Sequence, residues 1–518
     1  MDNILSIITF LPLLAGVVCF FVPDRAASGV ALVGSLLTML ASWTLWGGYD
    51  PGGAAFQFTE TIPWIEDLGI HYAVGIDGIS LLLILLTTLL TPVIILSASP
   101  AIHDRLNQYL GWMMVLETAM LGTFVALDTF LFYVFWELML IPMYFIIGMW
   151  GGERRIYATI KFFIYTMLGS LLMLVAILAL YVTYAEQTGS YSALLVDLYN
   201  TDLTYSTQLW MFAAFVLAFA IKVPIFPLHT WLPDAHVEAP TAGSVILAGV
   251  LLKMGTYGFL RFCLPYFPGA IATITPWMMS LAVIGIVYGA LVAMVQEDVK
   301  KLVAYSSVSH LGYVVLGVFA LNAQGLAGGL LQMLGHGLST GALFLLVGMI
   351  YERRHTKVIA EFGGLSKVVP VFAFVFMVVT FASVGLPGLN GFIGEFLILL
   401  GSFERAPVAT VFAASGVILG AVYMLWMFQR VMFGPLTNAS NKSMQDLTGR
   451  ELAYLAPILV LIVVMGVYPG PFLDVMQPSV ERLVDVLGQS NLSEATVALD
   501  VPHGAGAAVE AASSAGSH

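Results

Sequence analysis

The chain consists of long apolar blocks separated by short polar ones, and fourteen apolar segments can be counted along it. Most are about 20 residues long, the length that an α-helix needs to cross the ~30 Å hydrocarbon core of a bilayer. This pattern predicts an all-α polytopic membrane protein with about 14 transmembrane helices. The segments lie at 3–22, 27–47, 77–97, 111–127, 129–149, 161–184, 208–228, 241–263, 277–296, 301–320, 326–350, 370–399, 407–432 and 452–469.

The basic residues are distributed unevenly among the connections. Of the 19 Lys and Arg residues, fourteen follow odd-numbered segments, and only Arg261, Arg405 and Arg482 follow even-numbered segments. The remaining two, Lys222 and Lys253, fall inside apolar segments. Because Lys and Arg accumulate in cytoplasmic loops, we expect both the N- and C-termini to be periplasmic.

The amino-acid composition argues against several classes of protein. Hydrophobic residues make up 59% of the chain and charged residues only 10%, whereas a soluble domain carries about 25% charged residues. The net charge of −12 and the lack of a basic patch argue against a nucleic-acid partner. Cys19 and Cys263 form no CxxC, and there is no glycine-rich nucleotide loop, so we expect no cofactor or metal in this chain.

Two apolar segments are interrupted, and each interruption has a charge beside it. The seventh breaks at Val223–Pro227, directly after Lys222, and the twelfth breaks at Gly385–Gly391, just before Glu395. The odd offset of five segments implies two inverted five-helix repeats, segments 4–8 and 9–13. Paired broken helices in inverted repeats indicate a transport path, although Pro and Gly kinks are also common in polytopic proteins.

This organisation divides the chain into five parts. The tail is rich in Ala, Gly, Ser and Glu and is expected to be disordered. The parts are the first three segments (1–110), the first repeat (111–263), the inverted second repeat (277–432), the last segment with its terminal stretch (433–485) and the tail (486–518).

The charges inside apolar segments are the candidate functional residues. A charge at the bilayer centre costs ~3 kcal/mol, so it must be paired, neutralised or hydrated. Glu137 lies in the middle of LFYVFWELMLIPMYF, and Lys222 is its expected partner, forming either a proton switch or a static ion pair. Lys253 has no acidic residue in its own segment, and we expect it to exchange protons.

Two histidines continue this series toward Glu395, which is the mirrored end of the path. His310 in AYSSVSHLGY and His336 in LLQMLGHGLSTGALF lie in adjacent segments, each near Ser or Thr hydroxyls. Imidazole can pass protons near neutral pH, so a relay is favoured, with ordinary core packing as the alternative.

Three further residues are less certain. Glu117, in MMVLETAMLGTF, is either a relay or a partner for a neighbouring subunit. His229 and His236, in HTWLPDAH, do not match a zinc spacing. We expect hydrogen bonding within a loop for these two histidines.

Several of these stretches together resemble the antiporter-like subunits of respiratory complex I. They are WEL, KVPIFPLHTWLPDAHVEAPTAGS, LAGVLLKMGTYG, AYSSVSHLGY, HGLSTGALF and GLPGLNGFIGEF, and the resemblance covers about residues 75–435. Glutamate in the twelfth segment, here Glu395, is typical of the ND4-type subunits of bacteria.

The resemblance implies a proton path through Glu137, Lys222, Lys253, His310, His336 and Glu395 in a bacterial inner (plasma) membrane. It also implies that NADH, FMN, the iron–sulfur clusters and quinone bind to partner subunits, with ND2-type and ND5-type subunits and lipids beside this chain. Two alternatives stay open. One is a subunit of an Mrp-type cation/proton antiporter or a membrane-bound hydrogenase, and the other is a scaffold subunit that does not pump.

Overall fold

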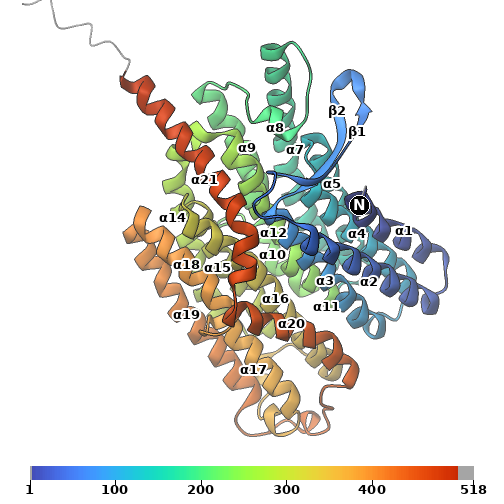
Figure 1. The fold of residues 1–518 in the computed structure, drawn as a ribbon. Helices are drawn as coiled ribbons and strands as arrows, with labels where there is room; N and C mark the ends of the chain where they lie inside the picture. Colours follow the sequence, from blue (N-terminus) through green and yellow to red (C-terminus); the bar gives the residue numbers. More distant parts are fainter. Residues whose placement is uncertain (1–2, 500–518) are drawn as a thin grey trace, which may run out of the picture.

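The computed structural model describes residues 3–499 of the 518, with side chains described to residue 488. It is built almost entirely of helices, as expected, and they run roughly side by side (Figure 1). In chain order they are α1 (Ile4–Phe21), α2 (Asp24–Gly48), α3 (Gly78–Ala101), α4 (Leu106–Val125), α5 (Thr129–Leu138), α6 (Leu140–Trp150), α7 (Arg155–Thr188), α8 (Leu195–Leu198), α9 (Tyr205–Lys222), α10 (Trp231–Glu238), α11 (Thr241–Ile246), α12 (Leu252–Gly258), α13 (Leu264–Tyr266), α14 (Pro268–Met294), α15 (Val299–Val318), α16 (Ala323–Arg354), α17 (Pro370–Val384), α18 (Asn390–Arg405), α19 (Pro407–Met432), α20 (Gly449–Val467) and α21 (Gly470–Leu499).

Eleven of the described helical segments are long and apolar enough to cross a membrane. Several of the described helices begin at a short polar side chain that accepts hydrogen bonds from the free backbone N–H groups of the first turn. Asp77 caps α3, Asp128 caps α5, Asp298 caps α15 and Asn322 caps α16. Polar residues between the apolar blocks therefore define where these four helices begin.

The helices at the centre differ from those at the periphery. The most apolar stretches of α16 and of the span Thr241–Tyr266 are entirely buried inside the protein. By contrast, α7 exposes a stripe of large apolar side chains that includes Ile164, Leu168 and Val175. The chain thus surrounds a protected central pair of spans and presents apolar faces outward, as a protein in lipid requires.

A two-stranded sheet was not expected from the sequence. Strands β1 (Gln57–Ile65) and β2 (Ile70–Ile76) pair antiparallel, within a connection that the sequence analysis left without structure. The hairpin lies at the same end of the bundle as α8, where Ala193 N donates to Gly69 O (Figure 1). We call this end the hairpin side, and the opposite end, which carries Arg154, Arg353 and Lys357, the basic side.

The C-terminal helix corrects part of the expected disorder. α21 packs along α3, α13, α14 and α16 and continues to Leu499, so residues 486–499 are helical rather than disordered (Figure 1). Leu, Glu and Ala favour a helix in this stretch, and no Pro or Gly interrupts it between Gly488 and Pro502. The remainder of the expected tail, 500–518, lies outside the described residues.

Candidate functional site

Both expected helix breaks are present, and each carries its charge at the break. α9 ends at Lys222, and the chain passes through the short helix α10 before α11 begins at Thr241. α17 ends at Val384, where Gly385 has φ 82°, and α18 begins at Asn390. Because Gly385 lacks a Cβ, it can adopt this left-handed conformation and lets the Glu395 carboxylate approach the break.

The span that carries Lys253 contains two π-helical segments. One covers Leu247–Leu251 and the other Phe259–Cys263, so the α-helical turn of Lys253 is flanked on both sides. Short π segments in helices are frequently found at functional sites. Lys253 is completely buried, its Nζ donates to Ala248 O, and it lies 2.7 Å from Nδ1 of His336.

From Lys253 a series of polar groups, with one gap between two histidines, leads to the second break. The rings of His336 on α16 and His310 on α15 have centroids 6.0 Å apart. Nδ1 of His310 lies 3.1 Å from Oε1 of Glu395 on α18. The structure therefore brings together four of the six expected path residues, and we call Lys253, His336, His310 and Glu395 the polar row.

Gln332 is a contact that the sequence analysis missed. Its Nε2 donates to Oε1 of Glu395 at 3.1 Å, the same oxygen that His310 contacts. Gln332 precedes His336 by four residues on α16, so the two side chains share one face of that helix. That spacing could have indicated Gln332, but a neutral amide carries no charge signal.

Glu137 and Lys222 do not form the expected ion pair. Lys222 is buried, and its Nζ lies 5.0 Å from the centroid of the Trp136 ring, a cation–π arrangement. Glu137 is partly exposed rather than enclosed, and Oε1 has no hydrogen-bond partner within the described part of the chain. Val134 and Ile141 are exposed on neighbouring turns, so Glu137 lies near the outer face of the bundle, with its Oε1 buried.

The remaining candidates make no hydrogen bond to the polar row in the described part of the chain, although His236 lies close enough to Lys253 and His336 to interact with them electrostatically. Glu117 on α4 is fully buried, and neither carboxylate oxygen has a hydrogen-bond partner among residues 3–488. The same holds for the ring nitrogens of His229 and His236, so the expected loop hydrogen bonds are absent there. His236 instead belongs to α10, and its ring stacks on Phe344 at 4.5 Å.

Cations cap the basic end of α10. The final carbonyls of a helix lack partners inside the helix and attract positive charge. Lys357 Nζ donates to Val237 O at 3.0 Å, Gly152 N to Glu238 O at 2.9 Å, and Lys300 Nζ to Ala239 O at 2.6 Å. These contacts fix the helix break to α15 and to the loop after α16.

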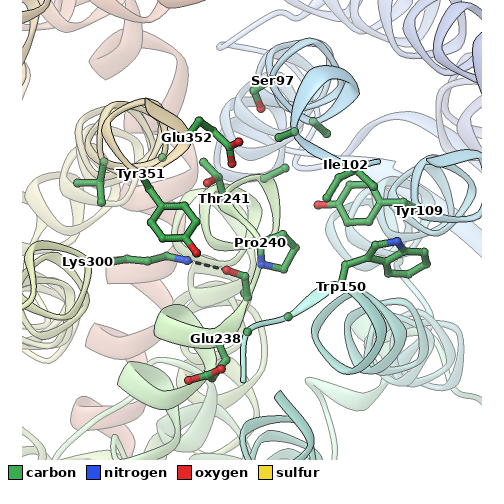
Figure 2. A pocket seen from close by; sticks show the side chains of 18 of the residues that line it. Ser97, Ile102, Tyr109, Trp150, Glu238, Pro240, Thr241, Lys300, Tyr351 and Glu352 are labelled. Atoms are coloured by element: carbon green, nitrogen blue, oxygen red, sulfur yellow. Dashed lines mark hydrogen bonds between the residues drawn. The ribbon is translucent and has the colours of Figure 1, made fainter. Parts of the chain in front are cut away.

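A cavity of about 230 Å³ lies beside this capped end. Figure 2 shows Lys300 reaching the turn at Pro240, with Tyr351 and Glu352 on one side of the view and Trp150 on the other. The cavity also contacts Thr241, the first residue of the span that carries Lys253. Polar side chains that line the cavity, such as Lys300 and Glu352, therefore lie near the start of this span.

The arrangement suits proton transfer and offers no site for a metal. An ammonium or amine, two imidazoles and a carboxylate can each bind and release a proton. Across the described residues, no group of three or more His, Cys, Asp or Glu side chains is placed to hold a metal ion.

Comparison with known proteins identifies one family and relatives with closely related names. Residues 126–465 match the family described as NADH:quinone oxidoreductase/Mrp antiporter, TM. NADH-quinone oxidoreductase subunit M of Rhodobacter capsulatus is 50% identical over 499 residues, covering 93% of this chain and 97% of the relative. NADH-ubiquinone oxidoreductase chain 4 of Arabidopsis thaliana is 46% identical over 484 residues, covering 93% and 97%.

Solved structures of the same fold point in the same direction. A chain of respiratory complex I from Thermus thermophilus matches with a TM-score of 0.86 and 34% identity, covering 93% of this chain and all of that one. A chain of the Mrp complex from Dietzia sp. matches with a TM-score of 0.83 over 93% of this chain and 98% of its own. Its identity is 19%, so that likeness shows the fold alone.

Proposed function

Because the chain belongs to the NADH:quinone oxidoreductase/Mrp antiporter membrane family, we propose that it is a proton-translocating membrane subunit of an NADH:quinone oxidoreductase, of the subunit M (ND4) type. The redox chemistry belongs to partner subunits, which would hold NADH, FMN, the iron–sulfur clusters and quinone. The chain itself supplies buried groups that hold and pass protons.

The observation that carries this proposal is the polar row. Lys253 and His336 share a hydrogen bond of 2.7 Å, and His310 and Glu395 one of 3.1 Å. The gap between the two imidazoles, 6.0 Å between ring centroids, is short enough for a ring rotation or one water molecule to bridge. A proton bound at Lys253 would pass to His336, then His310, and leave from Glu395.

Glu137 and Lys222 would form the input end of this path. Lys222 lies near Trp136 and interacts electrostatically with Glu137, so a change in charge near Glu137 would be felt at Lys222. The partly exposed residue Glu137 fits a contact with a neighbouring antiporter-like subunit. We propose ND2-type and ND5-type subunits at the two flanks, with lipids covering the remaining apolar faces.

The orientation follows from the basic side. Lys300, Lys357 and Arg353 lie there, and the positive-inside rule places such residues in the cytoplasm. Protons would enter from the cytoplasm through the cavity in Figure 2, beside Lys300 and Thr241. In this orientation both termini face the periplasm of a bacterial inner membrane. We further propose that the chain has about 14 spans, ten of which form two inverted five-helix repeats.

The first experiment is purification of the chain with its natural partners. Membranes are solubilised gently, the chain is captured, and the product is assayed for flavin and iron–sulfur absorbance and for NADH:quinone activity. The proposal predicts that all three accompany the chain. Recovery of small hydrophobic partners alone, with exchange of sodium for protons, would instead identify an Mrp-type antiporter.

A further inference from the structure

A second buried charge cluster lies on the hairpin side of Lys253. We call it the Arg261 cluster, and it consists of Asp77, Ser80, Tyr257 and Arg261. Nη2 of Arg261 lies 2.7 Å from Oδ1 of Asp77, and both side chains are 7% exposed. The sequence analysis placed Arg261 in an outer loop, but it lies inside the π segment of the span that carries Lys253.

Hydrogen bonds connect the members of the cluster to one another. Arg261 Nε donates to the Tyr257 hydroxyl at 3.2 Å, and Nη2 donates to Ser80 Oγ at 3.2 Å. Tyr257 follows Lys253 by four residues, so both occupy one face of the same helix. On the outer side, the Phe56 ring centroid lies 5.0 Å from the guanidinium carbon of Arg261.

The hydroxyls of Tyr257 and Ser80, 3.4 Å apart, form a polar route toward the hairpin side, and the Tyr257 hydroxyl also donates to Phe124 O at 3.2 Å. Lys253 itself contacts Ala248 O and His336, so a proton would have to cross one helical turn to reach Tyr257. The hydroxyls of Tyr257 and Ser80 can each donate and accept a hydrogen bond, so they could carry a proton. A guanidinium has five donors, no acceptor, and does not lose its proton in proteins. The route therefore ends at Arg261, whose fixed positive charge also opposes an arriving proton, as arginines do in selective pores.

From this geometry we propose that Arg261, held by Asp77, is a proton barrier that separates Lys253 from the hairpin side. The barrier directs protons from Lys253 along the polar row and blocks their direct return. This inference rests on the proposed function, because it assumes that Lys253 holds a transported proton. Asp77 serves two purposes, since Oδ1 also accepts the Ser80 backbone N–H at 2.9 Å and caps α3.

The test measures passive proton leak through the assembled complex in vesicles, without NADH. An imposed pH gradient across the membrane is followed with a pH-sensitive dye. The main variant combines Arg261→Gln with Asp77→Asn, which removes both charges, and asparagine keeps the cap of α3. We expect its leak to be several-fold faster than that of the native complex.

A matched control uses the ion pair Arg353–Glu451 on the basic side. Its atoms are 2.8 Å apart and it joins α16 to α20, away from the proposed route. The variant Arg353→Gln with Glu451→Gln should leak no faster than the native complex. Adding Tyr257→Phe to the main variant should restore the barrier, because the hydroxyl next along the route is then missing.

Three results would overturn the proposal: an assembled main variant with a native leak, an equal leak in the control, or no recovery with Tyr257→Phe. If the main variant does not assemble, Arg261→Lys replaces it. Lysine keeps the ion pair but can release a proton, so a leak is again expected and its absence contradicts the barrier. The leak needs no turnover, so a failure here is distinguishable from a failure of the polar row.

Discussion

Gln332 gives the sharpest prediction about the end of the polar row. Its Nε2 donates to Oε1 of Glu395 at 3.1 Å, while its own Oε1 is buried with no partner in the described part of the chain. The substitution Gln332→Leu removes the donor and also the unsatisfied oxygen. Leucine has a similar volume, so the fold should persist while the carboxylate loses support.

The size of the effect follows from that single hydrogen bond. A hydrogen bond to a charged group contributes about 1.5–3 kcal/mol, and each 1.4 kcal/mol corresponds to a factor of ten. Loss of this donor would therefore weaken the hold on the Glu395 side chain by a factor of roughly 10 to 150. Because His310 still contacts the same oxygen, we expect proton release about tenfold slower, at the low end of this range.

The assay is the initial rate of NADH-driven proton uptake by inverted membrane vesicles that contain equal amounts of assembled complex. Ser339→Ala is the control, since Ser339 is buried on the same helix but its hydroxyl donates to the backbone carbonyl of Gly335, one turn earlier, at 2.9 Å. The control should pump normally. A Gln332→Leu complex that pumps as fast as the control would refute the role given to this hydrogen bond.

Three other substitutions test the surrounding structure. Lys300→Met removes a cation from the end of α10 and should destabilise the fold by about 1–2 kcal/mol, seen as a lower midpoint of thermal inactivation; an unchanged midpoint contradicts the capping role. Gly385→Ala forces a side chain into φ 82°, at a cost of about 1–2 kcal/mol, and displaces the Glu395 carboxylate, so both the midpoint and proton uptake should fall. Glu117→Gln should leave proton uptake unchanged, because Glu117 contacts no member of the polar row, and a loss of uptake would show that it is a relay.

The helix breaks could be predicted from the sequence because they depend on the local backbone. Proline and glycine interrupt helices by rules that need no tertiary context, so the breaks after Lys222 and before Glu395 were predictable. The sequence also placed His310 and His336 between Lys253 and Glu395, but in the chain order Lys253, His310, His336, Glu395. The structure reverses the two histidines, with His336 next to Lys253 and His310 next to Glu395, because their contacts depend on how α15, α16 and α18 turn about their axes.

The predictions that were wrong, and the element that was not predicted, have specific physical causes. Glu137 and Lys222 were paired because their charges are opposite, yet sequence does not report that Glu137 faces the outside of the bundle. Arg261 was assigned to a loop because it lies near the end of an apolar segment, and its partner Asp77 is far away in the sequence. The hairpin of β1 and β2 was not predicted because it lies in a connection between spans, where the pattern of long apolar segments carries no information.

The most direct test of the polar row is the number of protons translocated per NADH oxidised by a His310→Gln complex. Glutamine keeps an N–H donor for Glu395 but cannot bind and release a proton as imidazole does. We predict that the ratio falls while the complex assembles and oxidises NADH. An assembled His310→Gln complex with the native ratio would contradict proton transfer through His310.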